Sequence, residues 1–246
     1  MNGYRKKDDQ YYRLITEARK CFERQEREKA CYWYAQAGLH QRPDAEMRDL
    51  ADFLVVAIEF RPELAGDIAR LLLAKSEPLP PLYIQDLFFC ALTIADHVLE
   101  QEVTKRVLAG PLTPNLCVRI ADMYFEYAAD RRHQVRAAQW IRRATETAPL
   151  TFDDWAAKAY AFYLLLDDEK APLAVLGCAQ RCVELAETTP TIDLDALQDL
   201  VEALSILDDG SIITKHLYDK ILANNLIPLP DKHRIWQEIK GNQGYL

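Results

Sequence analysis

Glycine is scarce in this chain, with 8 residues among 246. Glycine supplies the positive φ angles that tight β-hairpins need, so its scarcity counts against an all-β protein. The common residues are good helix formers instead, among them alanine, leucine, glutamate, glutamine, lysine and arginine. We therefore expect an all-α fold.

The sequence motifs of several enzyme classes are also missing. The chain has no glycine-rich phosphate loop, no G-x-S-x-G segment and no H-E-x-x-H segment. Cys178 and Cys182 share a helix face, but no second Cys/His pair with zinc-site spacing accompanies them. His97 and Glu100 also share a face, a pairing that is more often structural than catalytic. The sequence thus predicts no enzyme, no catalytic residue, no metal site and no cofactor.

Long apolar runs are absent as well. The richest stretch, residues 53–60, is short and contains Glu59, so no membrane insertion is expected. Residues 1–9 are polar and charged, which argues against a secretory signal. The 6 cysteines show no disulfide rhythm. We expect a cytoplasmic protein, with secretion by a signal-less route left open.

Positive charge is in the minority, with 30 Lys+Arg against 38 Asp+Glu and a net charge of -8. Non-specific nucleic-acid binding depends on clustered lysine and arginine, so nucleic acid is not an expected partner. The imbalance varies along the chain. Residues 1–43 carry 10 basic and 6 acidic side chains, and residues 151–246 carry 8 and 16. Such polarity can select a charged partner, and ordinary solvated helix faces give the same pattern.

Regularly spaced proline is what the chain does contain. Proline lacks an amide donor and disfavours a helical residue before it, so it ends helices. The breaks separate segments of about 35 to 40 residues, a period typical of repeat proteins. They lie at Pro43, Pro78/Pro80/Pro81, Pro111/Pro114, Pro149, Pro190 and Pro228.

Each segment has enough apolar periodicity for two helices, which predicts about six helical hairpins and a capping helix. The expected hairpins span residues 9–41, 45–76, 81–109, 115–147, 152–188 and 193–224, and the capping helix spans 231–240. No linker rich in glycine or serine separates them. We therefore expect one continuous domain over residues 1–246, built as a right-handed α-α superhelix.

Small and aromatic residues recur in the second helix of the first segment. Ala30 and Tyr34 are followed by Pro43, and residues 28–38 read E-K-A-C-Y-W-Y-A-Q-A-G. This pattern resembles tetratricopeptide repeats and the closely related Sel1-like repeats. Further partial matches lie in residues 137–149 and 155–178. The resemblance implies a scaffold, adaptor or chaperone-like holder that binds another protein or peptide without catalysis.

The resemblance places partner binding on the concave face or on the N-terminal aromatic hairpin. Tyrosine, tryptophan and arginine are enriched at binding hot spots, and Tyr12 and Trp33 are the aromatics that we expect to be exposed. Three arginines of residues 132–143 form a basic stripe, suited to an acidic peptide or phosphate, or to solvent. The candidate partner-binding residues are Tyr12, Arg19, Trp33, Arg119, Arg132, Arg136 and Arg143.

Two other function classes stay open. One is a secretion-associated chaperone or effector, which requires a dedicated client. The other is an all-α enzyme of unrecognised type, with a polar pocket near His97. The sequence does not predict the partner's identity or the oligomeric state.

Overall fold

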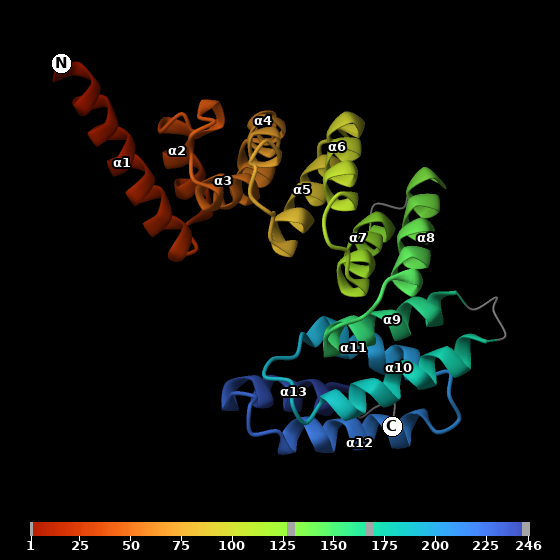
Figure 1. Ribbon diagram of the computed structural model, residues 1–246. Coiled ribbons are helices and arrows are strands. Elements are labelled where there is room, and N and C mark those ends of the chain that lie inside the picture. Colours follow the sequence, from red (N-terminus) through yellow and green to blue (C-terminus); the bar gives the residue numbers. More distant parts are fainter. Residues whose placement is uncertain (1, 127–130, 166–169, 243–246) are drawn as a thin grey trace. The chain divides into compact units, whose positions relative to one another are not determined.

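The computed structural model describes residues 2–126, 131–165 and 170–242, with side chains from residue 10 to residue 237 within these ranges. The described residues form helices joined by turns and contain no strand (Figure 1). The predicted all-α class is therefore confirmed. In chain order the elements are α1 (Asn2–Glu23), α2 (Arg27–Gln36), the short 3-10 helix η1 (Leu39–Gln41), α3 (Met47–Phe60), α4 (Pro62–Leu73), α5 (Pro81–Thr93), α6 (His97–Leu108), α7 (Pro114–Glu126), α8 (Arg131–Glu146), α9 (Phe152–Leu164), α10 (Ala171–Leu185), α11 (Leu194–Leu204), α12 (Gly210–Ala223) and α13 (Leu229–Asn242).

Each predicted hairpin contains two of these α-helices, and α13 occupies the position of the predicted capping helix. The largest difference is at the N-terminus, where α1 begins at Asn2 rather than near residue 9. Residues 127–130 and 166–169, inside two of the predicted hairpins, lie outside the described residues. Among the residues that are described, no helix has both the length and the apolar character to cross a membrane.

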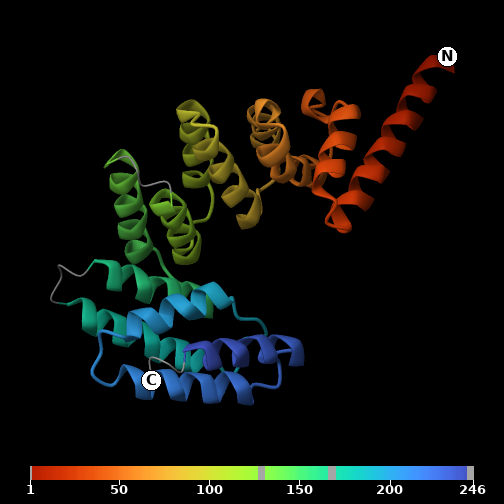
Figure 2. The ribbon, with the colours of Figure 1, turned by 180° about the vertical axis from the view of Figure 1, so that it is seen from behind.

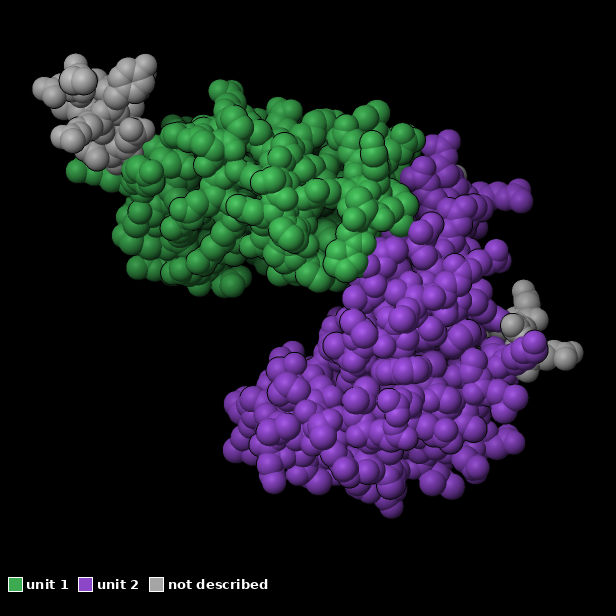
Figure 3. All heavy atoms as spheres, in the orientation of Figure 1, with its two compact units in different colours: residues 1–111 green, residues 112–246 purple. Residues whose placement is uncertain are grey.

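The chain divides into two compact units, residues 1–111 (unit 1) and 112–246 (unit 2), coloured separately in Figure 3. Within each unit most helices pack on the next helix, and several also pack on the next but one. In unit 1, α3 packs on both α1 and α5, and in unit 2, α9 packs on both α7 and α11. This is the packing of stacked helical hairpins. A single continuous domain over the whole chain stays a prediction.

Two hairpins of unit 1 share the same tight turn. Gln25, between α1 and α2, has φ 62°, and Ala95, between α5 and α6, has φ 53°. The next amide donates to the carbonyl five positions earlier in both turns, from Glu26 and from Asp96, with N···O distances of 2.9 Å. A left-handed residue followed by such a bond is how many helices end. The recurrence of this turn supports a repeated hairpin.

Side-chain caps explain where several helices begin. Thr151 and Asp154 form a capping box at α9, in which each side chain accepts from the other's backbone amide. The carboxylate of Asp193 accepts from the Asp195 amide at the start of α11.

Helix α9 is the centre of unit 2. It contacts α7, α8, α10 and α11 and is enclosed by these neighbours (Figure 2). Its buried side chains are mostly small, and small side chains let the neighbouring helices approach closely. They include Ala156, Ala157, Ala159 and Ala161. Because α9 packs on both α7 and α11, it holds these two helices near each other.

Candidate partner-binding surface

The first helices of three successive hairpins in unit 2 bring acidic side chains together around one arginine. Arg119 in α7 donates from Nη1 to Oδ2 of Asp122 at 3.0 Å and from Nη2 to Oδ2 of Asp199 in α11. Asp153, at the start of α9, accepts from the Asp193 amide at 3.1 Å. We define the acidic surface as Arg119, Asp122, Asp153, Tyr160, Asp193, Asp195, Asp199 and Glu202.

The central residues of the acidic surface are largely withdrawn from water. The side chains of Arg119, Asp199 and Asp122 are 17%, 14% and 32% exposed. Burial raises the pKa of Asp122, Asp153 and Asp199 from 3.8 to about 6 in each case. Arg119 opposes this shift in the pKa of all three residues, but burial remains the larger effect.

Further acidic groups add to the negative potential. Glu202 and Asp195 are exposed on α11, and both contribute to the raised pKa of Asp122. Burial raises the pKa of the Tyr160 hydroxyl, and the charges of Glu202, Asp199 and Asp122 raise it further. Tyr160 therefore stays protonated among carboxylates from two other helices. Three carboxyl groups with raised pKa values and one protonated phenol thus belong to the same surface.

A related ion pair joins the first two hairpins of unit 1. Arg19 in α1 donates from Nε to Oδ1 of Asp49 at 2.7 Å and from Nη2 to Oδ2 at 2.9 Å. Its Nη2 also donates to Glu46 at 2.6 Å. The Asp49 side chain is 2% exposed, so this bidentate pair is a packing element of α1 against α3.

Unit 1 also has partly buried carboxylates on its first helices. Burial raises the pKa of Asp52 in α3, with Asp49 raising it further and Arg48 opposing the shift. Burial raises the pKa of Asp86 in α5 to about 6, with a further contribution from Asp52. The Tyr34 hydroxyl, fully buried, has no hydrogen-bond partner among the described residues. These groups are less concentrated than those of the acidic surface.

Two of the candidate partner-binding residues, Arg19 and Arg119, are thus both paired with aspartates from other hairpins. Lys158 in α9 donates to the Thr147 carbonyl at 2.8 Å. Arg19 and Arg119 join helices of different hairpins through these pairs. The carboxylates around these two arginines therefore outnumber the cations.

The N-terminal hairpin exposes the ring of Tyr12, as expected, and that of Tyr32 rather than that of Trp33. Tyr12 is 64% exposed and Tyr32 is 54% exposed. Trp33 is only partly exposed, and its ring lies edge-on to Tyr32 with centroids 5.0 Å apart. Tyr11 stacks under the Arg42 guanidinium, 3.9 Å from its ring centroid.

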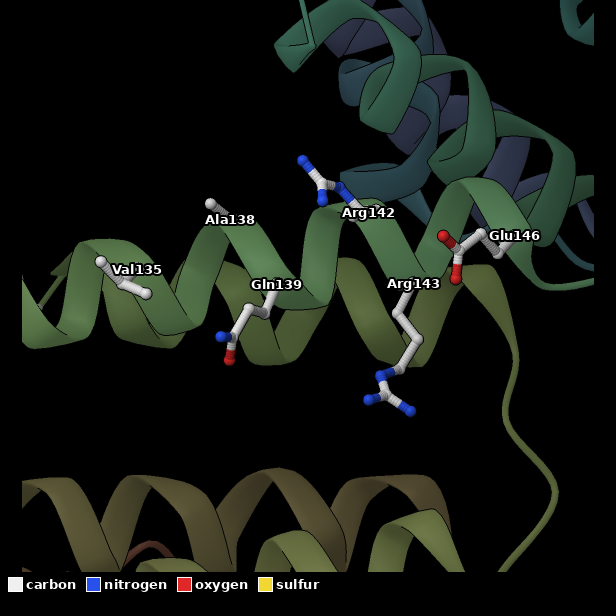
Figure 4. A pocket seen from close by; sticks show the side chains of 6 residues that line it. All are labelled: Val135, Ala138, Gln139, Arg142, Arg143 and Glu146. Carbon is white, nitrogen blue, oxygen red and sulfur yellow. The ribbon is translucent and has the colours of Figure 1, made fainter.

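The other predicted arginines lie along α8. Arg132 and Arg143 are exposed, whereas Arg136 is partly buried. Arg132 and Arg136 both make side-chain interactions of their own, and the Arg143 guanidinium lies 5.5 Å from the centroid of Trp140. A pocket beside this helix is shown in Figure 4. Its lining residues are Val135, Ala138, Gln139, Arg142, Arg143 and Glu146.

His97, Cys178 and Cys182 are the residues that the sequence raises for catalysis or metal binding. His97 Nδ1 lies 3.3 Å from Oε2 of Glu100, which is buried. Cys178 and Cys182 are buried thiols, and burial raises the pKa of both, that of Cys178 to about 11. No cluster of three or more potential metal ligands occurs in the part of the chain that the structure describes.

Comparison with known proteins found no relative: no family model, no curated protein and no solved structure matches the chain. The resemblance to tetratricopeptide and Sel1-like repeats therefore depends on the residue pattern of its hairpins.

Proposed function

We propose that this protein is a non-catalytic interaction module of the tetratricopeptide-like or Sel1-like class, which holds a cationic segment of a partner protein on its acidic surface. Stacked helical hairpins commonly bind partners along successive helices, which supports this proposal. The packing of α7, α9 and α11 provides such a row of helices in unit 2. The Ala30, Tyr34 and Pro43 pattern supports the repeat class.

The excess of carboxylates over cations carries the proposal. Arg119 is the only basic residue of the acidic surface, and its guanidinium is shared between Asp122 and Asp199. Asp153 receives a backbone amide rather than a cation. Partly buried carboxylates in this state repel one another and are stabilised by an added positive charge. A lysine or arginine from a partner supplies that charge.

Exposed and half-buried acidic residues have different roles in this proposal. Asp195 and Glu202 lie at the solvent boundary, where they attract and orient an approaching cation. Asp122 and Asp199 are less exposed, so a cation that reaches them is partly shielded from water. Because a bound cation favours the ionised carboxylates, binding strengthens as the pH rises through about 6, the pKa of these groups.

The test is a titration of the whole chain into a fluorescent oligolysine peptide, followed by anisotropy at pH 7.5. Asp195→Asn combined with Glu202→Gln removes two exposed charges and leaves the Arg119 pairs intact. We expect this double variant to bind oligolysine about fivefold more weakly, since exposed ion pairs are each worth about 0.2–1 kcal/mol. Added salt weakens binding for the same reason.

The matched control removes two charges from unit 1. Asp67 and Glu77 are exposed on that unit, so Asp67→Asn with Glu77→Gln changes the net charge by the same amount. The control is expected to bind as the unmodified chain does. Equal losses in the two double variants, or tighter binding of oligoglutamate than of oligolysine, contradict the proposal.

A further inference from the structure

Helix α8 has the opposite charge from the rest of unit 2. It contains five arginines and one glutamate, in a chain whose net charge is -8. The acidic surface lies on α7, α9 and α11 and includes no residue of α8. The charge of α8 therefore suits a partner segment of the opposite sign from the one proposed for the acidic surface.

Four exposed residues of α8 form one stripe. Arg131, Val135, Ala138 and Arg142 follow the spacing i, i+4, i+7 and i+11, which places them on one face of a helix. Val135 is 51% exposed. The two arginines are about 16 Å apart along the axis, at 1.5 Å per residue. We call these four residues the α8 stripe.

No helix of unit 2 covers the α8 stripe. The buried residues of α8, including Ala137, Trp140 and Ile141, lie on the opposite face, which packs on α7 and α9. Both ribbon views show α8 extending away from the helices that follow it (Figure 1, Figure 2). Figure 4 shows Ala138 and Arg142 on the same side of the helix. Neither Arg131 nor Arg142 has an ion-pair partner among the described residues.

We propose that the α8 stripe docks an acidic amphipathic helix of a second partner protein. Its apolar residues pack on Val135 and Ala138, and its carboxylates bind Arg131 and Arg142, a pairing for which guanidinium groups are suited. Although the chain as a whole is negatively charged, the positive charge of α8 attracts an acidic partner to this helix.

The apolar middle of the α8 stripe favours a peptide over a nucleic acid. A phosphate backbone has no apolar group to cover Val135 and Ala138. Binding of single-stranded nucleic acid also uses exposed aromatic rings for base stacking, and α8 presents none, since Trp140 is buried.

The test uses the full chain and a fluorescent helix-forming peptide that has two central leucines flanked by glutamates at the spacing of the α8 stripe. We expect anisotropy to show binding that falls about tenfold in Arg131→Glu with Arg142→Glu, since each reversal replaces an attraction by a repulsion. Arg13 and Arg24 are exposed in unit 1, so Arg13→Glu with Arg24→Glu is the matched control. It is expected to bind nearly as the unmodified chain does.

A charge swap separates direct contact from damage to the helix. The same peptide with lysines in place of glutamates is expected to bind the Arg131→Glu/Arg142→Glu variant more tightly than the unmodified chain. Circular dichroism checks that α8 variants keep their helix content. The proposal is overturned if stripe and control variants bind equally, if the lysine peptide gives no rescue, or if a single-stranded oligonucleotide binds the α8 stripe more tightly than the acidic peptide does.

Discussion

Arg119 in α7 donates a hydrogen bond to Asp199 in α11, a residue 80 positions further along the chain. The bond ties the first helix of one hairpin to the first helix of the next hairpin but one, and α9 packs on both of these helices. The same guanidinium bonds to Asp122 at 3.0 Å. One arginine thus neutralises part of the negative charge of carboxylates that come from two helices.

Replacing Arg119 by methionine keeps most of the side-chain volume and removes the charge. Two partly buried carboxylates then lack a cation, and we expect the free energy of unfolding at pH 7.5 to fall by about 2–3 kcal/mol. The loss is smaller at pH 5, because Asp122 and Asp199, with pKa values of about 6, then take up protons. Urea unfolding at both pH values measures it. A loss of the same size at pH 5 and 7.5 would show that packing, rather than charge, accounts for the effect.

Asp122→Asn is expected to stabilise the protein at neutral pH. The pKa of Asp122 is about 6 in the folded chain against an ordinary 3.8, so the folded state holds this proton more tightly than the unfolded state. Ionisation of Asp122 therefore lowers stability as the pH rises from 3.8 through about 6. Asparagine keeps an oxygen for Arg119 and cannot ionise. We expect a gain of about 1 kcal/mol at pH 7.5 and less at pH 5.

The control for Asp122→Asn is Asp67→Asn, a change of the same charge at an exposed position of unit 1. Chemical unfolding curves of the two variants are compared at both pH values. A gain that appears equally in the control, or that grows as the pH falls, contradicts the assignment of the effect to the buried Asp122 carboxyl.

Arg19→Ala tests the corresponding pair in unit 1. Asp49 is 2% exposed and loses both of its hydrogen bonds from Arg19, so we expect a destabilisation of about 3 kcal/mol. Arg13→Ala, at an exposed position of the same helix, should change stability by less than about 0.5 kcal/mol. Thermal unfolding of both variants measures the difference. Similar melting temperatures for the two would mean that Asp49 is hydrated and does not depend on Arg19.

Two glycines give opposite predictions for the same substitution. A Cβ at Gly177, inside α10, meets no atom within 4 Å, whereas one at Gly210 would lie 2.0 Å from the Leu204 carbonyl oxygen. Gly177→Ala should therefore stabilise the protein by about 0.5–1 kcal/mol through helix propensity. Gly210→Ala should destabilise it, because the turn before α12 must shift. Melting temperatures that move in the same direction for both would contradict the packing described at Gly210.

The helices were predictable because their signals are local. Proline opens α4, α5 and α7 at Pro62, Pro81 and Pro114, and apolar periodicity marks the helices themselves. The early start of α1 was not predicted, since residues 2–9 are polar and lack an apolar stripe. The local pattern thus predicts the helices, but it does not predict where α1 begins.

The acidic surface was not predictable, because its partners are distant in the sequence. Nothing local indicates that Arg119 pairs with Asp199, or Arg19 with Asp49, so both arginines looked available to a partner. The spacing of Arg119 and Asp122, at i and i+3, was the one visible sign that this arginine has an acidic neighbour. Burial of Asp153 and Asp199 depends on how α9 and α11 pack, which the pattern of residues does not show.

The most direct test of the central proposal, a cationic segment held on the acidic surface, is hydrogen–deuterium exchange of the full chain with and without oligolysine. We predict slower exchange over residues 114–126, 152–164 and 194–204 when the peptide is bound, and loss of that protection in Asp195→Asn with Glu202→Gln. Protection confined to unit 1 or to α8, or none at saturating peptide, would contradict the proposal.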